Sequence, residues 1–167
     1  YDFVLVDLMK GEHKQPEHLA RQPFGVVPAI DDDGFMLHES RAIIRYIDET
    51  VAGPRLTPAD AKGRARMEEQ ISVEHSYFTP AAMKIIGQML FAPMRGGQAD
   101  MAIVEAARGE LTRVLDITER TLEGRAFLAG DSFTLADISW MPYVDYAFAS
   151  QSGDLFLARP RIAAWWK

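Results

Sequence analysis

The segment from Gly25 to Ile47 constrains the fold of this chain more than any other part of the sequence. A β-branched run precedes Asp31–Gly34, and an apolar run follows it. Aspartates followed by glycine are typical of a tight turn. Pro28 closes the first run, because proline has no N–H to give to a strand ladder. Apolar residues at helical spacing then follow Ser40. The segment therefore predicts a β-hairpin that leads directly into a helix.

The predicted start of this helix carries polar groups that could serve either of two purposes. Glu39 and Ser40 place a carboxylate and a hydroxyl beside free backbone N–H groups and the positive end of the helix dipole, which suits a carboxylate ligand. The same side chains could instead cap the helix, a role worth about 1 kcal/mol. Taken alone, the segment favours the cap.

The rest of the chain separates into a short α/β part and a long helical part. Residues 3–7 are β-branched and aromatic and are predicted to form a strand, and a short helix is expected around 16–21. Glycine and prolines interrupt the pattern over 52–58, which is typical of a linker. We therefore expect an α/β domain at 1–51 and an all-α domain at 59–167.

Helical periodicity dominates the second part. It runs over 59–90, where Pro80 should cause a kink unless two helices meet there, and again over 99–122. Thr134 is the expected N-cap of a further helix, with Asp137 at the third helical position, so the pair predicts a capping box. For these two residues we expect a structural role.

The charge balance argues against two classes of partner. The chain has 18 Lys and Arg against 24 Asp and Glu, a net charge of −6, whereas nucleic acids and anionic membranes require a basic face. No apolar run reaches the ~20 residues of a membrane span. There is no cysteine, and the histidines lack the spacing of metal ligands, so neither a disulfide nor a metal site is predicted.

Several motifs together resemble the soluble glutathione transferases. Gly25-Val-Val-Pro-Ala, a turn, and Glu39-Ser-Arg-Ala-Ile-x-Arg-Tyr-Ile resemble the glutathione-binding half of these enzymes, and Gly11–Phe24 is similar to the phi class in particular. The resemblance extends to Ala164-Trp-Trp near the end of the chain. It implies a thioredoxin-like domain followed by an all-helical domain, in a cytoplasmic homodimer.

The resemblance also implies that the first domain is incomplete. The family fold begins with a strand and a helix, whereas this chain opens on what resembles the second strand, so we expect the first strand and helix to lie upstream. The hydroxyl or thiol that activates glutathione lies between them in the family. No catalytic residue is therefore predicted in this chain, and Ser40 is not expected to replace it, because its matched role is binding.

Two glutathione contacts are implied before the hairpin. His13 and Lys14 match a pair that holds the glycine carboxylate, although as residues alone they would be a solvated loop. Val27, followed by a Pro28 that is cis in the family, matches the residue whose backbone pairs with the cysteinyl part. Val26 departs from the family pattern, which usually has glutamine, so one polar contact is missing and affinity is expected to be lower.

A third contact lies after the hairpin, and a second pocket is expected in the helical part. Glu39 and Ser40 match the pair that receives the γ-glutamyl end, with Ser40 facing its carboxylate and Glu39 its ammonium. Phe91 is a candidate to line an apolar pocket for the second substrate. For Phe91 and its aromatic neighbours, packing between helices is the alternative.

The function implied is the conjugation of glutathione, as co-substrate, to hydrophobic electrophiles in detoxification, with glutathione-dependent peroxide reduction as a further activity. No other cofactor is expected. The alternative is a non-catalytic protein that binds glutathione or hydrophobic ligands. The residue in the first strand–helix loop would discriminate between them.

Overall fold

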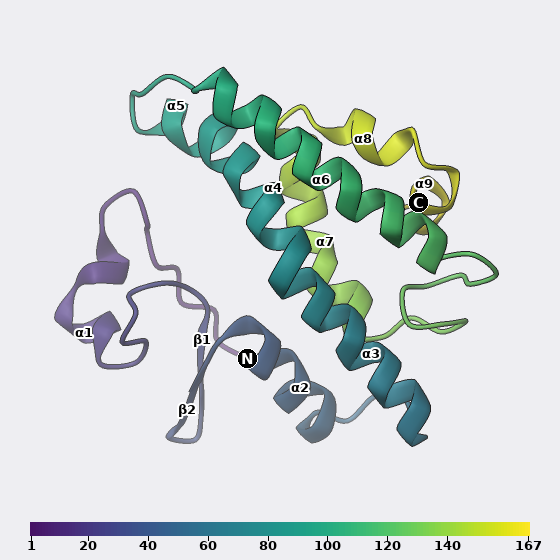
Figure 1. The fold of residues 1–167 in the computed structure, drawn as a ribbon. Coiled ribbons are helices and arrows are strands. Elements are labelled where there is room, and N and C mark those ends of the chain that lie inside the picture. The colour runs from purple at the N-terminus through teal and green to yellow at the C-terminus, as the bar shows by residue number, and fades with distance from the viewer. The chain divides into compact units, whose positions relative to one another are not determined.

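The chain divides between Arg55 and Leu56 into two units in the computed structural model, which describes residues 1–167 (Figure 1). This division falls within the range 52–58. Inside the first unit, the Arg55 guanidinium donates to the backbone carbonyl of Asp48 at 2.8 Å, so the end of the unit is tied back to its last helix.

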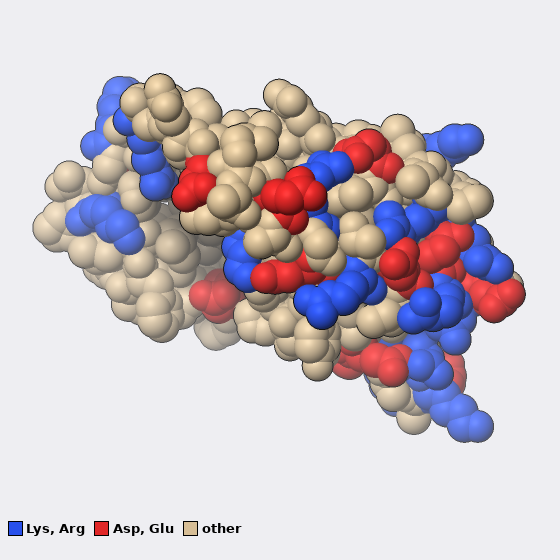
Figure 2. All heavy atoms as spheres, turned by 45° about the horizontal axis from the view of Figure 1, so that its top comes forward, with Lys and Arg blue, Asp and Glu red and all other residues tan.

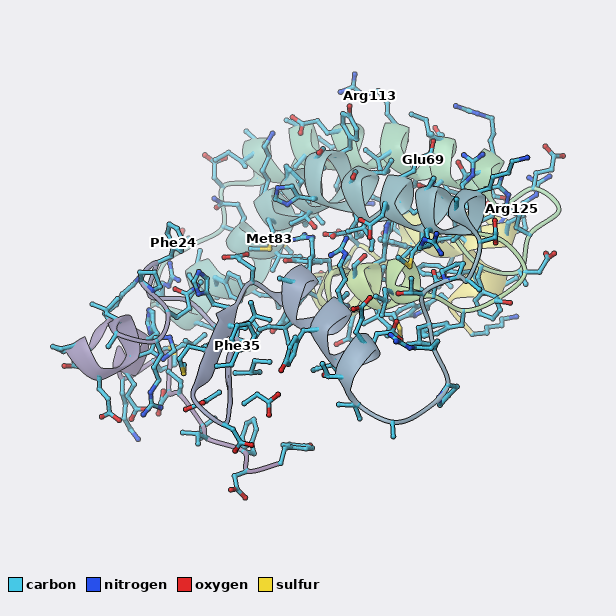
Figure 3. All side chains as sticks on the ribbon, turned by 90° about the horizontal axis from the view of Figure 1, so that it is seen from below. Phe24, Phe35, Glu69, Met83, Arg113 and Arg125 are labelled. Atoms are coloured by element: carbon cyan, nitrogen blue, oxygen red, sulfur yellow. The ribbon has the colours of Figure 1, made fainter.

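The first unit is a small α/β arrangement. A 3-10 helix, η1, and a short helix, α1, come first, a two-stranded sheet follows, and α2 ends the unit. The hairpin lies between α1 and α2 (Figures 1 and 3). The bounds are η1 Glu12–Lys14, α1 Pro16–Leu19, β1 Ala29–Asp32, β2 Phe35–His38 and α2 Ser40–Thr50.

The predicted hairpin is confirmed, with its first strand shifted toward the turn. β1 pairs antiparallel with β2 from Ala29↔His38 to Asp32↔Phe35. The two loop residues, Asp33 and Gly34, have φ values of 49° and 90°, the positive pair that a tight hairpin turn requires. The first strand begins only at Ala29, because the preceding valines and Pro28 take no part in the ladder.

The prediction of a strand over residues 3–7 is wrong. The structure has no strand there, and Phe3 and Leu5 are 79% and 72% exposed. The preference of β-branched and aromatic residues for strands reflects their fit to a half-buried sheet surface. Since no other segment pairs with residues 3–7, that preference alone does not make a strand.

The second unit is entirely helical. Asp60 caps its first helix by accepting from the N–H groups of Lys62 and Gly63 at 3.0 and 2.9 Å, and these bonds lower the pKa of the Asp60 carboxyl. Two π-helical turns, η2 and η3, interrupt the helices that follow. The bounds are α3 Ala61–Val73, η2 Glu74–Phe78, α4 Thr79–Ile86, η3 Gly87–Phe91, α5 Ala92–Met94, α6 Met101–Thr121, α7 Leu135–Ala149, α8 Gly153–Leu157 and α9 Pro160–Trp165.

Pro80 marks a junction between helices. It is the second residue of α4, and the π turn η2 precedes it, so the chain stays helical from α3 into α4. A proline in the first turn of a helix is tolerated, because the N–H it lacks would have had no partner inside that helix. Of the two alternatives that the sequence left open at Pro80, a kink or the meeting of two helices, the structure has the second.

The core of the second unit is built on aromatic stacking and on one face of α6. The Phe78 and Trp140 rings stack with centroids 4.2 Å apart, and Trp140 Nε1 donates to the carbonyl of Gln70 at 3.1 Å. The helical periodicity predicted over 99–122 is confirmed, and the apolar residues on one face of this helix are buried, namely Val104, Leu111, Leu115 and Leu122.

The start of α7 is held by a fully buried carboxylate. The Thr134 side chain accepts from the N–H of Ala136, and Asp137 Oδ2 accepts from the N–H of Thr134 at 2.8 Å, which completes the capping box. Asp137 Oδ1 also accepts from the N–H of Leu128 at 3.0 Å and from Trp165 Nε1 at 2.8 Å. One side chain therefore joins α7, the preceding loop and α9.

Charges of both signs are intermixed on the surface that Figure 2 shows. Some charged side chains pair between helices, such as Lys84 with Glu110 at 2.7 Å and Arg108 with Asp154 at 2.5 Å. The hydrogen bond from Arg108 lowers the pKa of the Asp154 carboxyl. None of the helices has the length and apolar character needed to cross a membrane.

Candidate functional site

All of the predicted glutathione contacts lie in the first unit, within or next to the ends of its short helices and strands. His13 and Lys14 belong to η1, and Val27-Pro28 and Glu39-Ser40 flank the hairpin. Because Ala29 pairs with His38, Pro28 and Glu39 come at the same open end of the hairpin. The sheet register therefore brings together two contacts that are separated in sequence.

Lys14 reaches the chain segment that leads to Val27. Its Nζ donates to the carbonyl of Phe24 at 3.2 Å. The neighbouring His13 keeps Nδ1 buried without a hydrogen-bond partner. A buried ring nitrogen without a partner is uncommon, because its desolvation is not compensated. Lys14 and His13 thus place an ammonium and an imidazole where the family resemblance predicts a contact with the glycine carboxylate of glutathione.

Gly25 makes the approach of Lys14 possible. Its φ of 62° suits glycine, and a Cβ there would lie 2.8 Å from Lys14 Nζ and 2.9 Å from the carbonyl oxygen of His13. The Lys14 side chain therefore occupies the space that a side chain at position 25 would need.

We expect Gly25→Ala to destabilise the protein more than Gly34→Ala, by about 1 kcal/mol or more, and to weaken glutathione binding. Both glycines have positive φ, but a Cβ at Gly34 meets nothing within 4 Å, so Gly34→Ala measures the backbone cost alone. Urea unfolding gives the stability difference, and calorimetric titration gives the affinity. Equal losses in the two variants would show that the Lys14 contact has no effect.

Val27 presents its backbone without an internal partner. No hydrogen bond of the structure uses its N–H or C=O, its side chain is 43% exposed, and the Val27–Pro28 peptide is cis. An unpaired backbone N–H and C=O in an exposed segment can pair with an extended peptide. The side chain of Val26 adds no polar group to this surface.

Glu39 and Ser40 do not cap α2, so the interpretation favoured by the segment alone is wrong. Glu39 is the N-cap residue, yet no side-chain cap hydrogen bond is made. Its φ and ψ are 75° and 110°, a conformation that L residues rarely adopt and that directs its side chain away from the capping position. Both residues are exposed, and their side chains enter no hydrogen bond of the structure. They are thus available to a ligand's carboxylate and ammonium groups.

The backbone of Glu39 gives a test of this geometry. A residue held in a sparsely populated conformation costs about 1–3 kcal/mol, and glycine avoids most of that cost. We therefore expect Glu39→Gly to be more stable than Glu39→Ala by about 1 kcal/mol, the reverse of the usual order of these residues. Thermal unfolding of the two variants decides this, and a more stable alanine variant would contradict it. Both variants lose the carboxylate and should bind glutathione equally weakly.

Phe91 packs within the helical unit. It ends η3, and its ring meets that of Tyr146 from α7 edge to face, with centroids 6.2 Å apart. This contact agrees with the alternative of helix packing. No group of three or more acidic or histidine side chains is arranged to hold a metal ion.

His18 was not singled out from the sequence as part of this site. Its Nε2 lies 2.7 Å from the carbonyl oxygen of Val26, directly before Val27. The two residues are joined by a loop rather than by a helix or strand, so no periodic pattern marks their contact.

Comparisons with known proteins show the family to which both parts of the chain are similar. Residues 1–49 match the family model for the glutathione S-transferase N-terminal domain, and residues 78–167 match that for the C-terminal domain. Glutathione S-transferase F11 of Arabidopsis thaliana is 40% identical over 99% of this chain and 79% of its own length.

Solved structures are similar over nearly all of the chain. Glutathione transferase F7 from Populus trichocarpa has a TM-score of 0.92 at 39% identity, covering 98% of this chain and 78% of that one. Glutathione S-transferase I from maize, solved in complex with an atrazine glutathione conjugate, has a TM-score of 0.90 at 36% identity, covering 99% and 78%.

Proposed function

Because the chain belongs to the glutathione S-transferase family, with phi-class plant enzymes among its relatives, we propose that it conjugates glutathione to hydrophobic electrophiles. Glutathione is the co-substrate, and the α/β part of the chain binds it. The maize relative solved with an atrazine glutathione conjugate supports an electrophile of this kind. We propose 1–51 as the glutathione-binding domain, 52–58 as the linker and 59–167 as the helical domain.

The start of α2, which no side chain caps, is the main observation that supports this proposal. The Ser40 hydroxyl and N–H, together with the helix dipole, would bind the γ-glutamyl carboxylate, and Glu39 would face the ammonium. The exposed backbone of Val27 would pair with the cysteinyl part, and His13 and Lys14 would bind the glycine carboxylate. These three groups of residues would thus hold glutathione in an extended form.

The chemistry needs glutathione as a thiolate, since the thiolate is the nucleophile. A hydroxyl that donates to the sulfur favours that form, and a nearby apolar surface raises the rate by holding the electrophile close. In this proposal the residues named above bind and orient glutathione, and none of them activates the thiol. Phe91 remains the proposed contact to the second substrate.

Finer features of the proposal follow from the family. We propose a cytoplasmic homodimer that acts in detoxification, with peroxide reduction as a second activity. Ala61 and Ala65 of α3 are small and exposed, which would allow a partner subunit to approach closely. Light scattering that shows a monomer at micromolar concentration would exclude the dimer.

The test of the enzymatic proposal combines binding with turnover. Calorimetric titration measures glutathione binding, and conjugation is followed spectroscopically with chlorodinitrobenzene. We expect the intact protein to bind glutathione and to show glutathione-dependent turnover. Binding without turnover on this substrate or on an organic peroxide would favour the non-catalytic alternative, and absence of binding would exclude both.

A further inference from the structure

One side chain from α1 contacts the turn that carries Val27, although it belongs to none of the proposed ligand contacts. His18 Nε2 lies 2.7 Å from the Val26 carbonyl oxygen, a short distance for an N–H···O bond. Because a carbonyl oxygen can only accept, Nε2 must carry the proton and donate. The imidazole therefore fixes the direction in which the Val26 carbonyl points.

Fixing that carbonyl also orients the next residue. The peptide bond between Val26 and Val27 is trans, so its C=O and N–H groups point to opposite sides. With the Val26 carbonyl turned toward His18, the Val27 N–H points away from that imidazole, and no hydrogen bond of the structure uses it. Lys14 holds the Phe24 carbonyl in a similar way, two residues earlier.

We propose that His18 is a positioning residue for glutathione, which aligns the Val27 backbone to pair with the cysteinyl part of the ligand. The inference rests on the proposed function of this site. The backbone is decisive here because neither Val26 nor Val27 has a polar side chain. Held in place before the ligand arrives, the Val27 groups lose less freedom on binding, and the affinity is higher.

The imidazole is not needed to build α1 itself. The His18 backbone carbonyl accepts from the N–H groups of Arg21 and Gln22, and these bonds do not involve the side chain. Replacing the side chain should therefore leave the local backbone in place and change mainly the orientation of the turn.

The test compares His18→Leu with His18→Gln in the full chain. Glutamine places an amide N–H close to the position of Nε2, whereas leucine has a similar size and no donor. We expect His18→Leu to weaken glutathione binding roughly three- to tenfold, the worth of one hydrogen bond, and His18→Gln to restore most of it. With chlorodinitrobenzene, the KM for glutathione should rise in the leucine variant while kcat is retained. His75→Gln, at an exposed histidine of the helical unit, is the control and should match wild type.

Equal glutathione affinities of the leucine and glutamine variants would overturn the inference. A fall in kcat without a change in KM would also overturn it. If the leucine variant does not fold, His18→Asn takes its place, since its amide is too short to reach Val26. Absence of glutathione binding by the wild-type protein would instead refute the proposed function, so the two failures are distinguishable.

Discussion

Asp137→Ala is expected to destabilise the helical unit by about 4 kcal/mol or more, because it leaves several buried donors without an acceptor. The carboxylate accepts from the Leu128 and Thr134 N–H groups, from the Thr134 hydroxyl and from Trp165 Nε1, and Asp137 is fully buried. Each donor left unsatisfied costs about 1–3 kcal/mol. The hydroxyl can turn to another partner, whereas the two backbone groups cannot.

Urea unfolding followed by tryptophan fluorescence measures this loss. Asp131→Ala is the matched control, since Asp131 lies exposed in the same loop and should change stability by less than about 0.5 kcal/mol. Thr134→Ala removes the cap bond from Ala136 and the hydroxyl bond to Asp137, and should cost about 1 kcal/mol. A loss at Asp137 no greater than that of Thr134→Ala would show that the bonds to Leu128 and Trp165 contribute nothing.

Ser40→Ala is expected to weaken glutathione binding roughly 10- to 150-fold, with little change in stability. A hydrogen bond to a charged group contributes about 1.5–3 kcal/mol, which corresponds to that loss of affinity. The Ser40 side chain makes no cap bond in the structure, so the usual cost of removing a cap, about 1 kcal/mol, should be absent.

Calorimetric titration of glutathione and thermal unfolding of the same samples separate these effects. Ser76→Ala, at an exposed serine in η2, is the control for both measurements. A lower melting temperature with unchanged glutathione affinity would return Ser40 to the role of a helix cap. Ser40→Thr keeps the hydroxyl and should recover part of the affinity.

These two variants act in different units and by different physics. Asp137 satisfies donors of its own chain, so its loss should appear in unfolding whether or not glutathione is present. Ser40 has no internal partner, and its loss should appear only when the ligand is added. Measuring both with and without glutathione therefore distinguishes residues that hold the fold from residues that hold the substrate.

Local pattern was sufficient wherever the interacting groups are close in sequence. The Asp33-Gly34 turn, the buried face of α6 and the capping box at Thr134 could all be predicted, because their geometry depends on a few neighbouring residues. The family could be recognised for a related reason: its motifs are short contiguous stretches, and the comparisons confirm it.

Tertiary structure decided the features that depend on distant partners. Residues 3–7 have strand-forming side chains but form no strand, because no other segment pairs with them in a ladder. The conformation of Glu39 removed the cap that the local pattern favoured. The bond from His18 to Val26 and the links from Asp137 to Leu128 and Trp165 join residues across loops. No periodic pattern records such contacts, since they form only when the fold brings the two segments together.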